Sequence, residues 1–218
     1  MKPFQLLLLL FFTNTICFNT LAQKGIRIGI RAGLNAATTS NGFGFGTSFK
    51  DPNYRIGSAF GLLVNIPLAA KLSLQPELNY SSEGSVQDGQ LPGSGSGSYT
   101  QIFELKTQYL NIPFLLQYKG NAKGLYFEAG PQLGSLLKSK LLTKVQLSGS
   151  SPETDVKSIF NSTVISGAIG GGLNISKGIG FGIRYTFSLS QAGSVPSISG
   201  DDQKINNSSI FIGMHVKM

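Results

Sequence analysis

The stretch Ile179-Gly180-Phe181-Gly182-Ile183-Arg184-Tyr185-Thr186-Phe187-Ser188-Leu189 places a large apolar residue at every second position, with glycine or polar residues between. Successive side chains of a β-strand point to opposite faces, so this period of two predicts a strand with one apolar face. The same alternation recurs in seven more segments, and glycines dilute it most in the sixth of the eight. The sequence therefore predicts an all-β fold of eight strands. The other segments are 26–35, 55–66, 72–81, 110–118, 125–133, 164–175 and 209–218.

The connections between these segments alternate between long and short. Four are long and polar, three contain only a few residues, and both chain ends fall on the side of the short ones. Outer-membrane barrels have this asymmetry, with short periplasmic turns and longer extracellular loops. The pattern predicts an eight-stranded antiparallel up-and-down transmembrane β-barrel with four long extracellular loops. The long connections are 37–54, 82–101, 137–158 and 190–208, and the short ones are 67–70, 119–123 and 176–178.

The two faces of the predicted strands differ in chemistry. One carries Ile, Leu, Phe and Tyr, whereas the other carries Arg, Glu, Gln, Asn and much glycine, too little apolar volume to fill a dry core. This favours an apolar face toward lipid and a polar face toward a narrow lumen. Alternation also suits a soluble lipocalin-like periplasmic binding protein, which turns its large apolar residues inward, and that alternative stays open. Pro76, Pro113 and Pro131 lie inside strands and predict bulges or lost hydrogen bonds.

The N-terminus has the features of a secretory signal peptide. Met1-Lys2 precedes an apolar run over residues 4–12, and Thr20-Leu21-Ala22 offers a small residue at the expected cut. The run is shorter than the ~20 apolar residues of a spanning helix. We therefore expect a signal peptide over 1–22 and an outer-membrane β-barrel domain over 23–218. Cys17 would leave with the signal, so the barrel would contain no disulfide.

Composition restricts the partners. The chain of 218 residues carries a formal charge of +8, only 13% charged residues and no basic run with interleaved aromatics. Such an excess on an exported barrel suits anionic lipid headgroups better than nucleic acid. We expect outer-membrane lipids, the barrel-assembly machinery and an envelope or secretion-system protein as partners, and no nucleic acid.

The residues give little sign of catalysis. His215 is the single histidine, with no Ser or acidic partner predictably beside it, and one histidine with scattered acids does not supply a metal site. We expect neither cofactor nor enzymatic activity, although a lipid-modifying enzyme that uses His215 is a third hypothesis. A set of inward charges stands out instead, because they could pair across the lumen as a plug or remain independently hydrated. They are Arg27, Arg31, Glu77, Glu128 and Arg184.

The segment Tyr109-Leu110-Asn111-Ile112-Pro113-Phe114-Leu115-Leu116-Gln117-Tyr118 resembles a strand typical of the PorT-type outer-membrane β-barrel family. Leu74–Tyr80, Tyr126–Pro131 and Gly182–Tyr185 resemble counterparts there. The resemblance implies an eight-stranded barrel in the outer membrane of a Gram-negative cell, and PorT itself is associated with a protein-secretion apparatus. Two departures are Asn111, where the family strand often has Glu, and the final Met218, where barrels commonly end in an aromatic residue.

These observations predict an integral outer-membrane barrel without enzymatic activity, which presents four long loops outward for an envelope-structural or interaction role. The alternatives are an accessory subunit of a protein-secretion system, as in PorT, and the soluble lipocalin-like protein.

Overall fold

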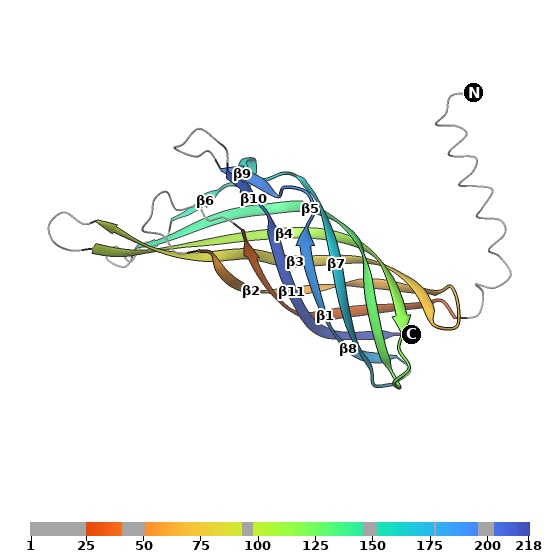
Figure 1. Ribbon diagram of the computed structural model, residues 1–218. Helices are drawn as coiled ribbons and strands as arrows, with labels where there is room; N and C mark the ends of the chain where they lie inside the picture. Colours follow the sequence, from red (N-terminus) through yellow and green to blue (C-terminus); the bar gives the residue numbers. More distant parts are fainter. Residues whose placement is uncertain (1–24, 41–50, 93–97, 146–151, 177, 196–202) are drawn as a thin grey trace, which may run out of the picture.

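Eight long strands close into a ring in the computed structural model, which describes residues 25–40, 51–92, 98–145, 152–176, 178–195 and 203–218 (Figure 1). Every neighbouring pair is antiparallel, and β1 closes the ring on β11 from Gly29↔Lys217 to Thr39↔Asn207. The predicted eight-stranded barrel is confirmed. The predicted signal peptide, with Cys17, lies outside the described residues. The strands, in ring order, are β1 (Arg27–Thr39), β2 (Asn53–Pro67), β3 (Leu72–Pro92), β4 (Ser98–Lys119), β5 (Leu125–Val145), β7 (Thr163–Asn174), β8 (Ile179–Ser188) and β11 (Asn207–Lys217).

Large apolar side chains cover the outside of the ring. Ile56 is 70% exposed and Leu34 63% exposed, whereas Glu77 and Arg184, on the inner face, are each 4% exposed. The predicted orientation, apolar outward and polar inward, is therefore confirmed. It disfavours the soluble lipocalin-like alternative, because a soluble barrel would turn these apolar residues inward. We call the exposed band the apolar belt; it includes Ile28, Ile30, Leu34, Ile56, Phe60, Leu62, Ile112, Phe114, Leu116, Phe127, Leu133, Ile165, Ile169, Phe181, Ile183, Ile212 and Met214.

Tight connections join the strands at one end of the barrel, where the C-terminus also lies (Figure 1). Leu68 N donates to Leu72 O at 2.9 Å, and Gly120 N donates to Leu125 O at 2.9 Å. The three short turns are thus where the sequence predicts them. This is the short-turn end, and the other is the long-connection end.

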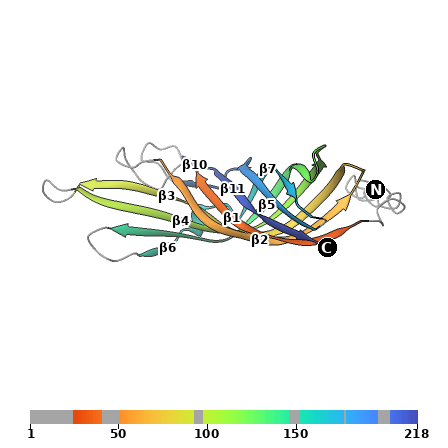
Figure 2. The ribbon, with the colours of Figure 1, turned by 90° about the horizontal axis from the view of Figure 1, so that it is seen from below.

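Two of the four predicted loops are largely strand. β3, β4 and β5 continue far beyond the belt into the predicted loops 82–101 and 137–158, and they project to the left in Figure 2. We call residues 82–92, 98–108 and 138–145 the extended ribbon. The prediction was wrong here because the apolar alternation stops at 81, yet a strand outside lipid needs only backbone pairing, such as Val86↔Glu104. Short elements lie in the connections that follow β5 and β8: β6 (Glu153–Asp155) and the 3-10 turn η1 (Lys157–Ile159) after β5, and β9 (Gly193–Val195) and β10 (Gln203–Ile205) after β8.

A small apolar core lies at the long-connection end. Leu105 and Leu136, on β4 and β5, are covered by Val156, Phe160 and Ile205 from the short elements. This core buries apolar surface, unlike the exposed apolar belt, and it stabilises the base of the extended ribbon.

The three strand prolines interrupt ladders without shifting them. On the β3–β4 ladder the pairs Pro76↔Phe114 and Asn79↔Asn111 keep one register, and the pairing is interrupted between them, beside Pro113. Similar interruptions lie beside Pro76 on β2–β3 and beside Pro131 on β4–β5. The bulges lie elsewhere, between Tyr54 and Ala59 and at Gln108/Tyr109. Lost ladder pairs, rather than bulges, accompany the prolines, since proline has no N–H to donate.

Among the described residues, no helix is long and apolar enough to cross a membrane.

Candidate functional site

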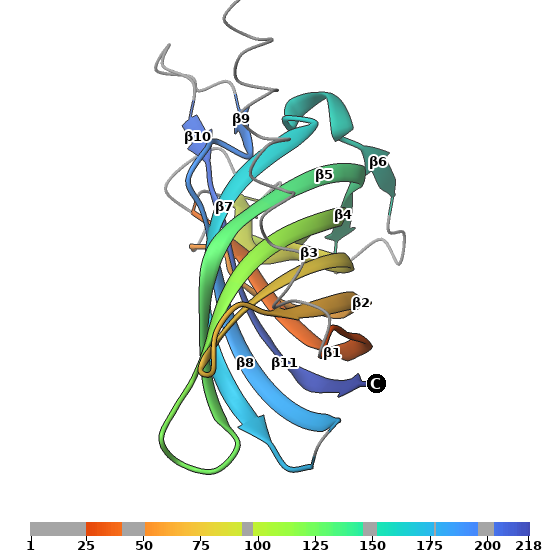
Figure 3. The ribbon, with the colours of Figure 1, turned by 90° about the vertical axis from the view of Figure 1, so that its right-hand side faces the viewer.

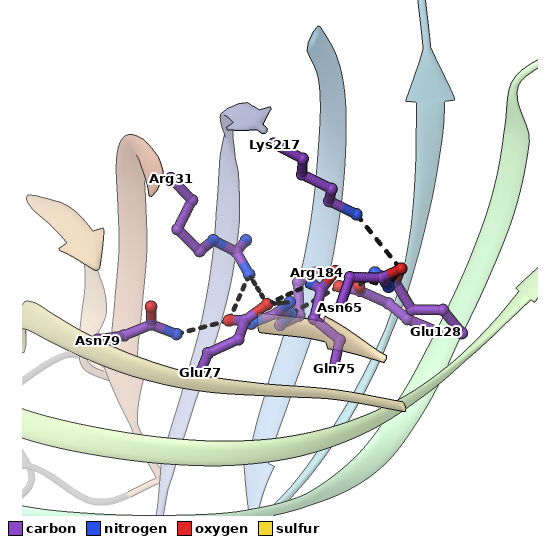
Figure 4. Close-up of polar contacts among 9 residues, drawn as sticks. Arg31, Asn65, Gln75, Glu77, Asn79, Glu128, Arg184 and Lys217 are labelled. Carbon is purple, nitrogen blue, oxygen red and sulfur yellow. Dashed lines mark hydrogen bonds and ion pairs between the residues drawn. The ribbon is translucent and has the colours of Figure 1, made fainter. Parts of the chain in front are cut away.

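Glu77 is the centre of a polar network in the lumen (Figure 4). It points inward from β3, and both of its oxygens accept hydrogen bonds from arginine. Arg184, from β8, donates through Nη1 and Nη2 at 2.8 and 2.9 Å, and Arg31, from β1, donates through Nη1 at 2.8 and 3.0 Å. Because β3 and β8 face each other across the ring, this fork joins opposite walls of the barrel.

Arg184 also reaches a second carboxylate. Its Nε donates to Glu128 Oε1 at 2.7 Å, so the two arginines and the two glutamates form one neutral cluster. The structure thus brings together four of the five charges selected from the sequence. It places Arg27 apart from the cluster, toward the short-turn end, where Arg27 lines the opening of the lumen with Lys217.

Neutral side chains that the sequence reasoning did not select complete the network. Gln75 Nε2 and Asn79 Nδ2 each donate to Glu77 at 2.7 Å, and Gln117 Nε2 donates to Glu128 at 2.8 Å. Phe211 lies under Arg31, with the guanidinium carbon 4.2 Å from the ring centroid. Their inward position in the strand alternation was a usable signal. The pairing partners were not predictable, because they depend on how the strands are staggered.

A third buried acid lies toward the long-connection end. Glu83 is 8% exposed and accepts a hydrogen bond from Ser81 Oγ at 2.7 Å, while Asn111 Nδ2 donates to Ser81 Oγ at 2.8 Å. Asn111, the departure from the family strand, therefore belongs to this group rather than to the Glu77 cluster. Glu83 was not selected from the sequence because it lies within the segment 82–101, which was predicted as a loop.

The space left inside the barrel is small on either side of the cluster. A cavity of about 40 Å³ is lined by Arg31, Glu83 and Arg184, and one of about 10 Å³ lies between Glu128 and His215. Such volumes hold one or a few waters. A larger space of about 360 Å³ opens at the short-turn end. The Glu77 cluster therefore lies across the lumen between two small cavities, and we call it the plug.

Among the residues that the structure describes, His215 contacts an amide and a phenol. Its Nε2 lies 3.0 Å from Asn174 Oδ1, and its ring meets the edge of Tyr126 at 5.8 Å between centroids. An amide and a phenol do not activate a nucleophile in the way that a triad requires. Within the described ranges, no group of three or more His, Cys, Asp or Glu side chains could hold a metal ion.

The extended ribbon carries paired charges on its outward face. Glu104 accepts from Arg55 Nε at 3.1 Å and from Lys144 Nζ at 3.0 Å, and Lys106 lies 3.6 Å away. Burial alone would raise the pKa of Glu104, but hydrogen bonds from Lys144 and Arg55 and the charge of Lys106 hold it below its ordinary value. This charged face begins where the apolar belt ends, and it marks the limit of the lipid-facing surface.

A closed ring, an apolar belt and a polar plugged lumen define the class of the protein: an integral membrane barrel of the outer membrane. A family model described as outer membrane protein beta-barrel domain matches residues 21–192. The chain belongs to this family, and the protein is an outer-membrane protein. The match is to the domain as a whole, so the narrower PorT-type resemblance stays a prediction.

Three solved structures are similar in fold. Ail of Yersinia pestis, in complex with the heparin analogue sucrose octasulfate, shares 12% identity over 88% of this chain and 99% of its own, with a TM-score of 0.44. Neisserial surface protein A shares 13% over 89% and 100%, with a TM-score of 0.42. OprG of Pseudomonas aeruginosa shares 13% over 90% and 98%, with a TM-score of 0.42. No match is found among curated proteins. Similarity at this level says nothing of a shared ligand or activity.

Proposed function

We propose that this protein is a non-enzymatic outer-membrane barrel whose extended ribbon is a binding surface for a partner outside the membrane. The observation that carries the proposal is the continuation of β3, β4 and β5 beyond the apolar belt, anchored by the core around Leu105 and Leu136.

The length of these strands exceeds what the membrane requires. A tilted strand of ~9–11 residues spans a bilayer, whereas β3, β4 and β5 have 21, 22 and 21 residues. Ordering the surplus costs conformational entropy, about 1–2 kcal/mol per residue for the backbone alone. A segment that is ordered at this cost, and that does not contribute to membrane insertion, supports a role outside the bilayer.

Truncation of the ribbon tests the proposal. Val86 and Glu104 face each other across β3 and β4, so residues 87–103 can be replaced by an Asn-Gly turn without changing the register below them. We expect this variant to reach the outer membrane and keep a heat-dependent shift in gel mobility. We also expect the truncated strain to lose one of two properties of the parent strain. These are its resistance to detergents and large antibiotics and the chemical cross-links between the intact protein and its partner. The matched control replaces only residues 93–97 with the same turn and keeps the paired ribbon.

Two results would redirect the proposal. Unchanged cross-links and unchanged resistance to detergents and large antibiotics in the truncated strain would exclude a binding role for the ribbon. Loss of secreted-protein export, with cross-links unchanged, would point instead to the accessory secretion role that the PorT-type resemblance implies.

We also propose that residues 1–22 are removed on export and that the barrel-assembly machinery inserts the remaining 23–218. The mass of the protein purified from outer membranes tests this point. We expect a chain that begins at Gln23, and a mass that includes residues 1–22 would contradict it.

A further inference from the structure

The short-turn end of the barrel contains a hollow that the plug does not fill. Its volume is about 360 Å³, and ends of β1, β4 and β11 line it together with the turn between β4 and β5. In an outer-membrane barrel this end faces the periplasm. We call this hollow the periplasmic mouth. Its size lies within the range of small-molecule sites.

The charge of the mouth is one-sided. Arg27, Lys119, Lys123 and Lys217 line it, and among the described residues that line it none is Asp or Glu. The cations come from opposite walls, since β4 and β11 face each other across the ring. Cations that converge from several sides on one hollow produce a positive potential that attracts small anions.

The carboxylates deeper in the lumen are already engaged. Glu77 is held by two arginines, and Glu128 accepts from Arg184 and from Gln117. The hydrogen-bond donors of both carboxylates therefore come from the plug and from neutral side chains beside it.

Lys217 shows how the cations are placed. It is the last residue of β11, points inward and is 8% exposed. Its Nζ lies 3.4 Å from the neutral amide oxygen of Gln117 (Figure 4). At the rim, Lys71 Nζ donates to another amide oxygen, that of Asn121, at 2.7 Å. The acceptors in these two contacts are neutral amides rather than carboxylates. An oxyanion in the mouth would therefore gain charge-assisted hydrogen bonds from these ammonium groups.

We propose that the periplasmic mouth is an anion site that binds the phosphate groups of a small soluble ligand from the periplasm. Phosphate suits it because one group can accept from several cations at once. Phospholipid headgroups carry the same chemistry, but they lie against the outer wall, whereas Arg27 and Lys217 are directed into the lumen.

Calorimetric titration of the folded full barrel with inorganic pyrophosphate, in micelles of an uncharged maltoside detergent, tests the site. We expect saturable binding that weakens as sodium chloride rises from about 50 to about 300 mM, because salt screens the exposed part of the interaction. Lys217→Gln and Lys123→Gln should each weaken binding about fivefold or more. Lys138→Gln removes an exposed charge at the opposite end of the barrel and should leave it unchanged. The heat-dependent mobility shift verifies that each variant is folded.

Three outcomes would overturn the proposal. The first is no heat of binding. The second is equal weakening in Lys138→Gln, which would show attraction to overall charge rather than to the mouth. The third concerns lipid. If pyrophosphate fails to bind in maltoside while phosphatidylglycerol is retained over phosphatidylcholine in nanodiscs, and Lys217→Gln abolishes that retention, the cations serve the membrane.

Discussion

At the scale of single residues, the lumen is organised by carboxylates that collect several donors. Glu77 accepts from Arg31, Arg184, Gln75 and Asn79, which satisfies its oxygens within the barrel. A buried charge of this kind is tolerated because its partners are charged and well oriented. Its removal leaves the arginines in the lumen with less compensation than the fold requires.

Glu77→Gln is therefore expected to destabilise the barrel by about 3 kcal/mol or more, the usual effect of breaking a buried ion pair. Urea unfolding in lipid vesicles, followed by circular dichroism because the chain contains no tryptophan, measures the change. Glu153→Gln is the control: Glu153 pairs with the exposed Lys140, so its loss should cost at most about 1 kcal/mol. A Glu77→Gln midpoint equal to that of the parent would show that the plug does not stabilise the fold.

At a few inward positions, only glycine leaves enough space for the side chains that face it. A Cβ on Gly182 or Gly172 would lie 2.5 or 2.6 Å from the Tyr126 hydroxyl, and one on Gly180 would meet the ring of His215 at 2.7 Å. The missing side chains make room for two rings that cross the narrow lumen. Glycine at these inner positions is therefore required for packing, although it weakens the apolar alternation in the sequence.

At the scale of elements, the extended ribbon behaves differently from the strands below it. The ring strands curve around the lumen, as the view along the barrel shows (Figure 3), whereas β3 and β4 leave the ring as a projecting pair (Figure 2). Outside lipid the two faces of the ribbon need not differ as the barrel faces do, so charge pairs replace the apolar belt. This difference should make the stability of the ribbon depend on the ionisation of its charge pairs.

Glu104 provides the test of that difference. Its pKa is held below the ordinary value in the folded ribbon, so its contribution is present at neutral pH and is lost as the pH falls through the folded value. We expect Glu104→Gln to lower the free energy of unfolding in urea at pH 7 by at most about 1 kcal/mol. Once the pH is below the folded pKa of Glu104, the parent and the variant should converge. A difference that is unchanged by acid would mean that the ion pairs with Arg55 and Lys144 contribute nothing.

At the scale of the whole molecule, closure of the ring and filling of the lumen go together. An eight-stranded barrel is only wide enough to be filled by side chains, and the Glu77 cluster links β1, β3, β5 and β8 across it. Cavities among the described residues near the plug have volumes of about 40, 20 and 10 Å³. We therefore predict that ions do not pass through the barrel.

Planar bilayers in concentrated potassium chloride should therefore show no stable unit conductance after insertion of the protein. The control is the protein-free bilayer, with insertion verified by protease cleavage of the extended ribbon from one side. Steady ohmic steps of uniform size would contradict a plugged lumen and would reopen a transport role.

The sequence predicted most of the barrel but only part of the candidate site. The seventh predicted strand, 179–189, differs from β8 by one residue. It was predictable because side chains that face lipid and lumen in turn give an alternation visible in the local sequence. The charges Arg31, Glu77, Glu128 and Arg184 were identified as inward for the same reason. The Glu83 group escaped because its surroundings are polar on both faces.

The sequence by itself determined the number of strands, the face each turns to lipid and the end at which the short turns gather, since these follow from a period of two and from turn lengths. The tertiary structure decided how far β3, β4 and β5 extend, what covers Leu105, and which charges meet. Glu77 and Arg184 are 107 residues apart and lie on opposite walls. Their contact depends on the stagger and tilt of the closed ring, and no local pattern encodes these.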